Sequence, residues 1–124
     1  MFRFPKKQRL CREKEIEKLF SNGNYFSEKP FSVIWSFEER QDSVFIKSLI
    51  VVSKKKVKLA VRRNAIKRKI KEAYRINKKQ LECVLRRKDK QLNLALIYQN
   101  EETLDYMIIE EKINLVFNRL FNLL

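Results

Sequence analysis

A strongly basic segment from residue 54 to residue 79 constrains this chain more than any other feature. It contains thirteen lysines and arginines but only one acid, Glu72, so it carries +12 of the chain's net charge of +14. On a helix, which turns about 100° per residue, one side collects Ile66, Ile70, Ala73 and Tyr74. The opposite arc holds Asn64, Lys67, Arg68, Lys71, Arg75, Lys78 and Lys79. The pattern predicts a helix with one buried face and one cationic strip.

The cationic strip is not balanced by acids on the same helix. Charge runs are usually solvated surfaces, in which acids alternate with bases four residues apart and stabilise the helix. Here Lys67, Lys71 and Arg75 follow one another at that spacing with no acid between them on the strip. Binding of a polyanion would neutralise the repulsion. We therefore expect nucleic acid to bind the strip. Asn64 could cap the helix, contact the nucleic acid or do both, because the two roles are compatible.

Length and composition favour one folded domain over residues 1–124. With 124 residues, of which 44% are hydrophobic, the chain can bury one modest core. It has no histidine and only Cys11 and Cys83, too few for a disulfide framework and without the neighbours of a metal site. We interpret both as reduced thiols of a cytoplasmic protein. We expect no membrane contact, because there is no apolar run of 18 residues and no signal core.

The hydrophobic pattern predicts an α/β fold with the order α-β-β-α-β-α. The expected elements are a helix at 11–21, strands at 31–37 and 44–52, a helix at 63–84, a strand at 92–98 and a helix at 104–124. The second strand, the basic helix and the third strand form a βαβ unit.

Several connections have their own signals. Residues 1–9 contain Pro5 and four cations, typical of an extended basic arm. We expect Gly23 to close the first helix through a positive φ. The polar segment 38–43 indicates a hairpin connection, the more apolar strand at 44–52 is expected to be central, and residues 86–90 are expected to form a turn.

An apolar surface is predicted beside the first helix. Ile16 and Phe20 lie four residues apart, a pair that usually belongs to a core. An aromatic groove bordered by cations is also what single-stranded nucleic acid needs, because bases stack on rings while phosphates meet charges. Phe31, Ile34 or Trp35 of the following strand are candidates for the same groove. The alternation alone leaves open which face of that strand lines it.

The sequence gives little sign of catalysis by protein groups. Without histidine, a hydrolase would need clustered carboxylates, a metal centre or an activated nucleophile. The acids are scattered, and Glu13 and Glu17 share a helix face among lysines. This chain is expected to bind nucleic acid rather than cleave it.

The basic segment resembles the conserved motif of the bacterial ribonuclease P protein subunit. In that family an Arg-Asn-Arg box opens a basic helix that continues with Lys-Arg; here Arg63, Asn64 and Ala65 stand in the box, followed by Lys67 and Arg68. The resemblance extends to Arg9-Leu10, to Ile16 and Phe20 before Gly23, and to the order of elements. Ala65 departs from the family arginine and removes one expected phosphate contact.

This resemblance implies a fold and a function. The fold would be a single-domain α/β sandwich similar to a domain of ribosomal protein S5, with a left-handed βαβ crossover. The function would be to join a catalytic RNA that removes the 5′ leader from precursor tRNA, with magnesium held by the RNA. No further protein partner is implied. The implied RNA contacts are Arg9, Lys54, Lys55, Lys58, Arg63, Asn64, Lys67, Arg68, Lys71 and Arg75. The implied leader groove is formed by Ile16, Phe20, Phe31, Ile34 and Trp35.

Other functions remain possible from the residues alone. A ribosomal or RNA-assembly protein could use the same basic helix on ribosomal RNA, and composition hardly separates the two. A self-sufficient nuclease is disfavoured by the lack of histidine. Sequence-specific DNA binding would need base-reading side chains that the pattern does not show.

Overall fold

The computed structural model describes residues 13–39 and 44–124. Within these ranges the elements are α1 (Glu13–Asn22), β1 (Asn24–Glu28), β2 (Phe31–Glu39), β3 (Ile46–Val52), α2 (Ala60–Asn77), α3 (Lys79–Lys88), β4 (Lys90–Tyr98) and α4 (Tyr106–Leu123). The predicted arm at residues 1–9 lies outside the described residues.

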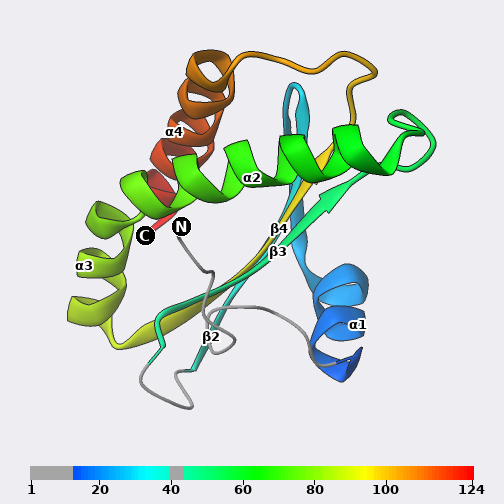
Figure 1. Ribbon diagram of the computed structural model, residues 1–124. Coiled ribbons are helices and arrows are strands. Elements are labelled where there is room, and N and C mark those ends of the chain that lie inside the picture. Colours follow the sequence, from blue (N-terminus) through cyan, green and yellow to red (C-terminus); the bar gives the residue numbers. More distant parts are fainter. Residues whose placement is uncertain (1–12, 40–43) are drawn as a thin grey trace.

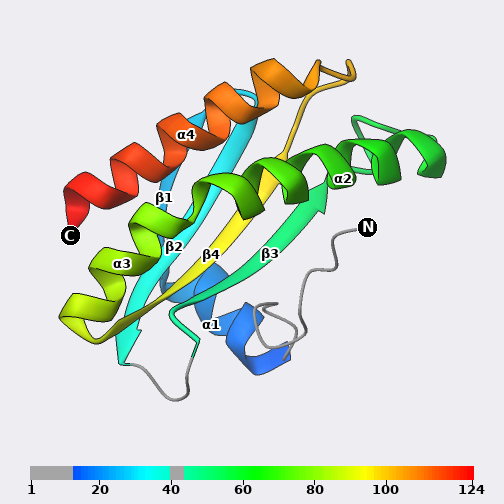
Figure 2. The same cartoon turned by 60° about the vertical axis from the view of Figure 1, so that its left-hand side comes forward.

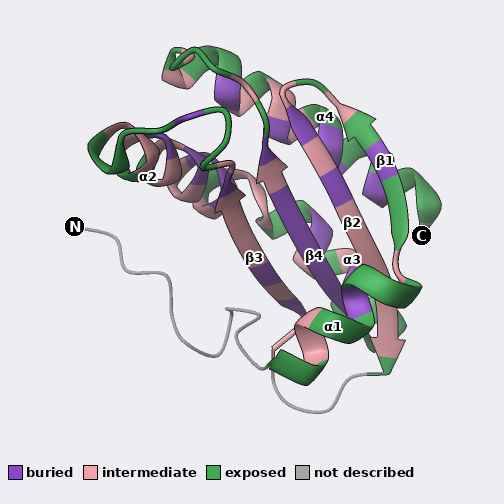
Figure 3. Cartoon of the chain, turned by 90° about the vertical axis from the view of Figure 1, so that its right-hand side faces the viewer, coloured by how far each residue is buried: buried purple, intermediate pink, exposed green. Residues whose placement is uncertain are grey.

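One mixed sheet organises the molecule (Figure 1). Its strand order is β1-β2-β4-β3; β1 with β2 and β2 with β4 are antiparallel, while β3 and β4 are parallel. Helices α2, α3 and α4 cover one face, and among the described helices only α1 lies on the other (Figures 1 and 3). The α/β sandwich expected from the sequence is confirmed.

The connection from β3 to β4 through α2 and α3 is left-handed. In Figure 2 both strands run upward, α2 passes in front of the sheet, and β4 lies to the left of β3. Almost all such connections are right-handed, because strand twist favours that hand. The left-handed crossover implied by the resemblance is therefore present.

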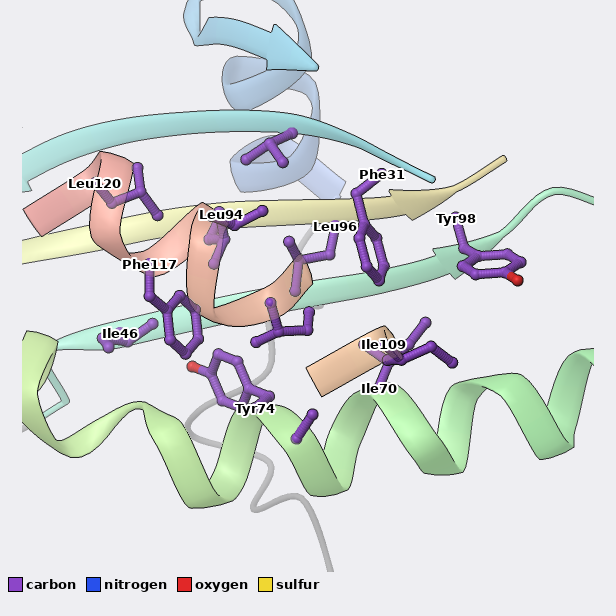
Figure 4. Packing of buried hydrophobic residues seen from close by; sticks show 14 of the residues in the cluster. Phe31, Ile46, Ile70, Tyr74, Leu94, Leu96, Tyr98, Ile109, Phe117 and Leu120 are labelled. Carbon is purple, nitrogen blue, oxygen red and sulfur yellow. The ribbon is translucent and has the colours of Figure 1, made fainter. Parts of the chain in front are cut away.

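The main core lies between the sheet and the three helices on its covered face (Figure 4). The predicted buried side of α2 is confirmed, since Ile66, Ile70, Ala73 and Tyr74 are all buried there. Burial of each large apolar side chain contributes about 1.5–3 kcal/mol. The Tyr74 hydroxyl is the one polar group on the buried side of α2. It accepts a hydrogen bond of 2.8 Å from the Ser48 hydroxyl.

Successive side chains of a strand point to opposite faces of the sheet, so each face has its own set of buried residues. Phe31 and Val33 of β2 and Leu94 of β4 are buried in the main core, with Trp35 and Phe37 partly buried against it. The intervening residues face α1, where a second cluster unites Leu19 and Ala95 with Ile16, Ile34 and Leu49. The buried faces predicted for the strands at 31–37 and 92–98 are thus confirmed.

Gly23 is needed for space rather than for an unusual φ. No glycine in the described residues has a positive φ, so the predicted left-handed closure of α1 is wrong. A Cβ on Gly23 would lie 2.4 Å from the Leu19 carbonyl oxygen and 2.8 Å from Ile34 Cγ2. The amide of Gly23 donates to that same carbonyl oxygen at 2.8 Å. The missing side chain lets α1 turn directly into β1 while resting on β2.

The strand predictions need three corrections. Strand β1 was not predicted, because its polar sequence Asn-Tyr-Phe-Ser-Glu has a weak strand signal. The hairpin predicted at 38–43 is wrong, because β2 extends to Glu39 and pairs with β1 and β4 rather than with β3. Strand β3 pairs only with β4 among the described strands, so it is not central.

The helix predictions need correction in length. The single helix expected at 63–84 consists of α2 and α3, separated at Lys78, and α2 begins three residues earlier, at Ala60. Helix α3 continues to Lys88 through most of the predicted turn at 86–90 and ends at Asp89, which has φ 53°. In the helix expected at 104–124 the buried residues are Ile109, Ile113, Val116, Phe117 and Leu120, whereas Phe121 is exposed. No helix in the described ranges has the length and apolar character required to span a membrane.

Candidate nucleic-acid interface

Some cations of the basic segment hold the protein together. The Nη1 group of Arg63 donates hydrogen bonds to the carbonyl oxygens of Val57, at 2.9 Å, and Lys58, at 2.8 Å. Arg62 donates to the carbonyl oxygen of Glu101 at 2.6 Å, and Lys69 donates to the connection before α4. Arg63, predicted as an RNA contact, therefore also fixes the loop that leads into α2.

Arg75 has an acidic partner on its own helix. Its Nη2 group lies 2.5 Å from Oε1 of Glu72, and this hydrogen bond lowers the pKa of the Glu72 carboxyl. Of the predicted RNA contacts that the structure describes, Arg75 alone has a carboxylate partner in the described part of the chain.

The other predicted cations are available to a ligand. Their side chains make no hydrogen bond or ion pair with any described residue, and they are Lys54, Lys55, Lys58, Lys67, Arg68 and Lys71. Asn64 is exposed among them, but Leu59 occupies the N-cap of α2, so the predicted capping role of Asn64 is wrong. From here on, the name cationic strip refers to Asn64 and these six cations, and no longer includes Arg75, Lys78 and Lys79. Arg9 lies outside the described residues.

Helix α1 crosses only one end of the sheet face on its side (Figure 3). Helix α1 rests on Ile34, Leu49 and Ala95 through Leu19 and Ile16. Toward the end of β4 the same face carries Ile97 and Val51, which lie opposite each other in the register and are partly exposed. Phe20, whose side chain is 45% exposed, lies on α1 next in sequence to Leu19, which packs on this face. We call this surface the open groove.

The five predicted groove residues do not share one face. Ile16 and Ile34 belong to the cluster under α1, and Phe20 lies on the same helix. Phe31 is 1% exposed in the main core, and Trp35 packs against that core. Both belong to the opposite face, because strand side chains alternate and Ile34 lies between them in register. Grouping Phe31 and Trp35 with Ile16 was therefore wrong.

Tyr25 is a groove residue that the sequence reasoning missed. It pairs with Ile34 across β1 and β2 and therefore points to the α1 face. Its side chain is 63% exposed, the larger exposure of the two aromatics on this face. This role depends on β1, whose five residues place Tyr25 and Phe26 side by side and therefore show no apolar–polar alternation.

The other side of α1 has a different character. Around the helix, Lys14 lies about 120° and Lys18 about 160° from Phe20, and both border a pocket of about 200 Å³ together with Glu38. Gln91, 4% exposed, lies at this pocket and donates to Asn93, while its own Oε1 has no partner. Opposite charges alternate here, as in the 3.3 Å contact of Lys18 with Glu38. The apolar, cation-bordered surface is thus confined to the Phe20 side.

The arrangement suits binding a nucleic acid and offers little for hydrolysis. In the described ranges no group of three or more histidine, cysteine or acidic residues comes close enough to hold a metal ion. Figure 3 shows α2 and the loop before it beside the β3 edge of the open face. An apolar floor therefore lies next to a source of positive charge, the combination that single-stranded nucleic acid requires.

Comparison with known proteins gives a consistent family. The model of the ribonuclease P family matches residues 4–120. The ribonuclease P protein components of two Porphyromonas gingivalis strains are each 31% identical over 109 residues, which covers 88% of this chain and 80% of theirs.

Solved structures show the same fold. The ribonuclease P protein of Staphylococcus aureus superimposes with a TM-score of 0.71 at 19% identity, covering 91% of this chain and 94% of that one. The protein of Thermotoga maritima gives 0.65 at 24% identity, covering 90% and 96%.

Proposed function

Because this chain belongs to the ribonuclease P protein family, we propose that it contacts the catalytic RNA through its cationic strip and the 5′ leader of precursor tRNA through its open groove. The observation that carries this proposal is that most lysines and arginines of the basic segment form no ion pair within the described part of the protein. Six of the cations predicted to contact RNA make no side-chain hydrogen bond or ion pair with a described residue, although the chain carries a net charge of +14. An RNA backbone would neutralise them and release its counterions.

The proposed contacts with the catalytic RNA come from two parts of the basic segment, helix α2 and the loop before it. Lys67, Arg68 and Lys71 repeat along α2 and can follow a phosphate backbone. Lys54 and Lys55 extend the charge onto the loop after β3. Arg63 contributes indirectly, since it holds that loop against the start of α2.

The open groove suits the leader because a leader is single-stranded. Its bases are free to stack, and Phe20 and Tyr25 offer two exposed rings on one face. Ile16 and Ile34 supply apolar contact without stacking. Such contacts tolerate any base, as required of a subunit that serves many precursors.

Hydrolysis is assigned to the RNA. We propose that the RNA holds the magnesium ions that activate water, and that the protein contributes position and electrostatics in the cytoplasm. The described residues provide no carboxylate cluster for a metal of their own, and no step of the reaction is assigned to them.

Reconstitution tests this function. The protein is assembled with the cognate catalytic RNA, and leader removal is measured with and without it at low magnesium concentration. We expect the protein to lower the KM for precursor tRNA and to matter less for a precursor with a very short leader. Co-purification with ribosomal RNA and no effect on leader removal would instead support a ribosomal role, whereas cleavage by RNA-free protein would support a nuclease.

A further inference from the structure

A second pocket lies at the end of the sheet away from α1. It has a volume of about 570 Å³ and lies between the turn joining β1 to β2 and the connection from β4 to α4. Tyr25, Ser32 and Gln99 line it from the sheet, with Lys29 from the turn and Lys112 from α4. Tyr25 and Ser32 project from the same face as Ile34, because they share its register. The pocket therefore continues the open groove toward the end of β4.

Hydrogen bonds inside the pocket leave donors facing a ligand. The Ser32 hydroxyl donates to Oε1 of Gln99 at 2.9 Å, and the amide of Glu102 donates to Oδ1 of Asn100 at 3.2 Å. Both side-chain oxygens are thus occupied, and the NH₂ groups of Gln99 and Asn100 remain as donors. A pocket with unused donors suits a ligand rich in acceptors.

The charge of the pocket agrees with its donors. Lys29 and Lys112 line it, and neither has an acidic partner among the described residues. The nearest acid on β1, Glu28, is 3.5 Å from Arg119, which also lies over the Phe26 ring. Two uncompensated ammonium groups beside amide donors match a phosphodiester.

An aromatic wall completes the pocket. Tyr25 is 63% exposed, so its ring is not part of the core. The buried Phe31 forms an apolar floor of the pocket. A base stacked on Tyr25 would put its phosphate within the region of the two lysines. The volume lies within the range of small-ligand pockets, about 300–1,000 Å³, and accommodates a single nucleotide.

We propose that this pocket, formed by Tyr25, Lys29, Gln99, Asn100 and Lys112, binds one nucleotide of the precursor leader beyond the part held near Phe20. Its base stacks on Tyr25, and its phosphate is bound by the lysines and amide donors. The inference rests on the proposed function, because it assumes that the leader occupies the open groove. Recognition is tolerant of base identity, since stacking and phosphate binding do not read base edges.

Precursors with leaders of increasing length test the pocket. The protein assembled with the catalytic RNA is titrated with each precursor, and affinity is plotted against leader length. For the long leaders, Tyr25→Ala should weaken binding about tenfold, whereas the shortest leaders should bind unchanged. Tyr25→Phe, which keeps the ring, should restore the wild-type profile. The melting temperature of each variant checks that the exposed substitution leaves the fold intact.

Salt dependence tests the two lysines separately. Lys29→Ala combined with Lys112→Ala should reduce the slope of log affinity against log salt by about 0.7 for long leaders only, the value for one phosphate of a single strand. Lys90→Ala, at the opposite end of β4, is the matched control and should leave the length profile unchanged.

The outcomes separate the pocket from the groove. If longer leaders bind more tightly and Phe20→Ala weakens them, but neither Tyr25→Ala nor the double lysine variant changes long or short leaders, the pocket assignment is wrong. The groove at Phe20 then stands without Tyr25 as a stacking partner. Equal losses for long and short leaders with Tyr25→Ala would also overturn the pocket. Affinity that does not depend on the leader at all would contradict both.

Discussion

Several single residues in this fold have structural roles that cannot be predicted from the residue type alone. Gly23 and Tyr74 are examples, one because it lacks a side chain and the other because its hydroxyl is buried. Arg63 is a third, since an arginine expected to contact RNA also holds backbone carbonyl groups. The role of Gly23 depends on Ile34 of β2, and the role of Tyr74 depends on Ser48 of β3. The role of Arg63 depends on the course of the backbone just before α2.

Gly23→Ala should destabilise the protein by about 1–3 kcal/mol, because the new Cβ would be 2.4 Å from the Leu19 carbonyl oxygen. Urea denaturation measures the change. Asn22→Ala, at the exposed preceding position, is the control and should stay within about 0.5 kcal/mol of wild type. An unchanged stability for Gly23→Ala would mean that α1 can move away from β2 at no cost.

The buried hydroxyl of Tyr74 predicts a pH dependence. Burial raises the pKa of Tyr74 well above its ordinary value, despite the hydrogen bond from Ser48. In the unfolded chain the hydroxyl titrates near about pH 10. The neutral form therefore stabilises the fold fully below pH 10, and this contribution is lost as the pH rises further.

Tyr74→Phe should remove that alkaline component. The free energy of unfolding, measured from pH 8 to pH 11, should fall less steeply above pH 10 in the variant than in wild type. Below pH 9 the difference between the two proteins should be constant, about 1–3 kcal/mol in favour of wild type, because Ser48 loses its partner. Parallel curves over the whole range would show that Tyr74 titrates normally.

At the scale of elements, α2 combines two functions on opposite sides. Ile66 and Ile70 anchor it in the core, while the cationic strip faces outward. Helix α1 shows the same division, with Leu19 in its small cluster and Phe20 on the groove side. Substitutions on the outer sides should therefore affect binding without unfolding the protein.

Arg68→Ala with Lys71→Ala should weaken RNA binding about tenfold and reduce the salt slope by about two, one per phosphate contact. Affinity for the catalytic RNA across a salt series measures both. Arg87→Ala with Lys90→Ala removes the same charge from α3 and β4 and serves as control. If the two double variants behaved alike, net charge rather than the strip would explain binding.

Phe20→Ala should weaken binding of precursor tRNA more than binding of mature tRNA, by about tenfold, because only the precursor carries a leader to stack on the ring. Parallel titrations of the two RNAs with the assembled enzyme give the comparison. The exposed Ser21→Ala on the same helix is the control. Equal losses for both RNAs would make Phe20 a structural residue.

At the scale of the whole molecule, charge distribution is the main constraint. The chain carries +14, and few of its cations in the 54–79 segment are paired internally. Such self-repulsion lowers the stability of the compact state. The open groove and the cationic strip therefore exist at some cost in stability, which a bound polyanion reverses.

Sulfate or phosphate should raise the melting temperature by several degrees at millimolar concentration, because these anions bind the folded state and neutralise its clustered cations. Differential scanning calorimetry with chloride at matched ionic strength separates binding from screening. A melting temperature that responds equally to chloride and sulfate would argue against a specific polyanion surface.

The local features of this protein can be inferred from its amino-acid sequence. Charge excess and helical period identify the cationic strip and the buried side of α2, because both properties depend only on residues a few positions apart. Alternation likewise identifies the buried faces of β2 and β4. These patterns, with the resemblance of the basic motif, sufficed to predict the fold class and family.

How those faces meet depends on contacts between residues that are distant in the sequence. That β4 lies between β2 and β3, that Phe31 and Ile34 serve opposite faces, and that Gly23 has no room for a side chain all follow from long-range pairing. Periodicity shows that two faces differ without showing which partner covers each. The open groove exists because α1 covers one part of a sheet face, and no local pattern contains that information.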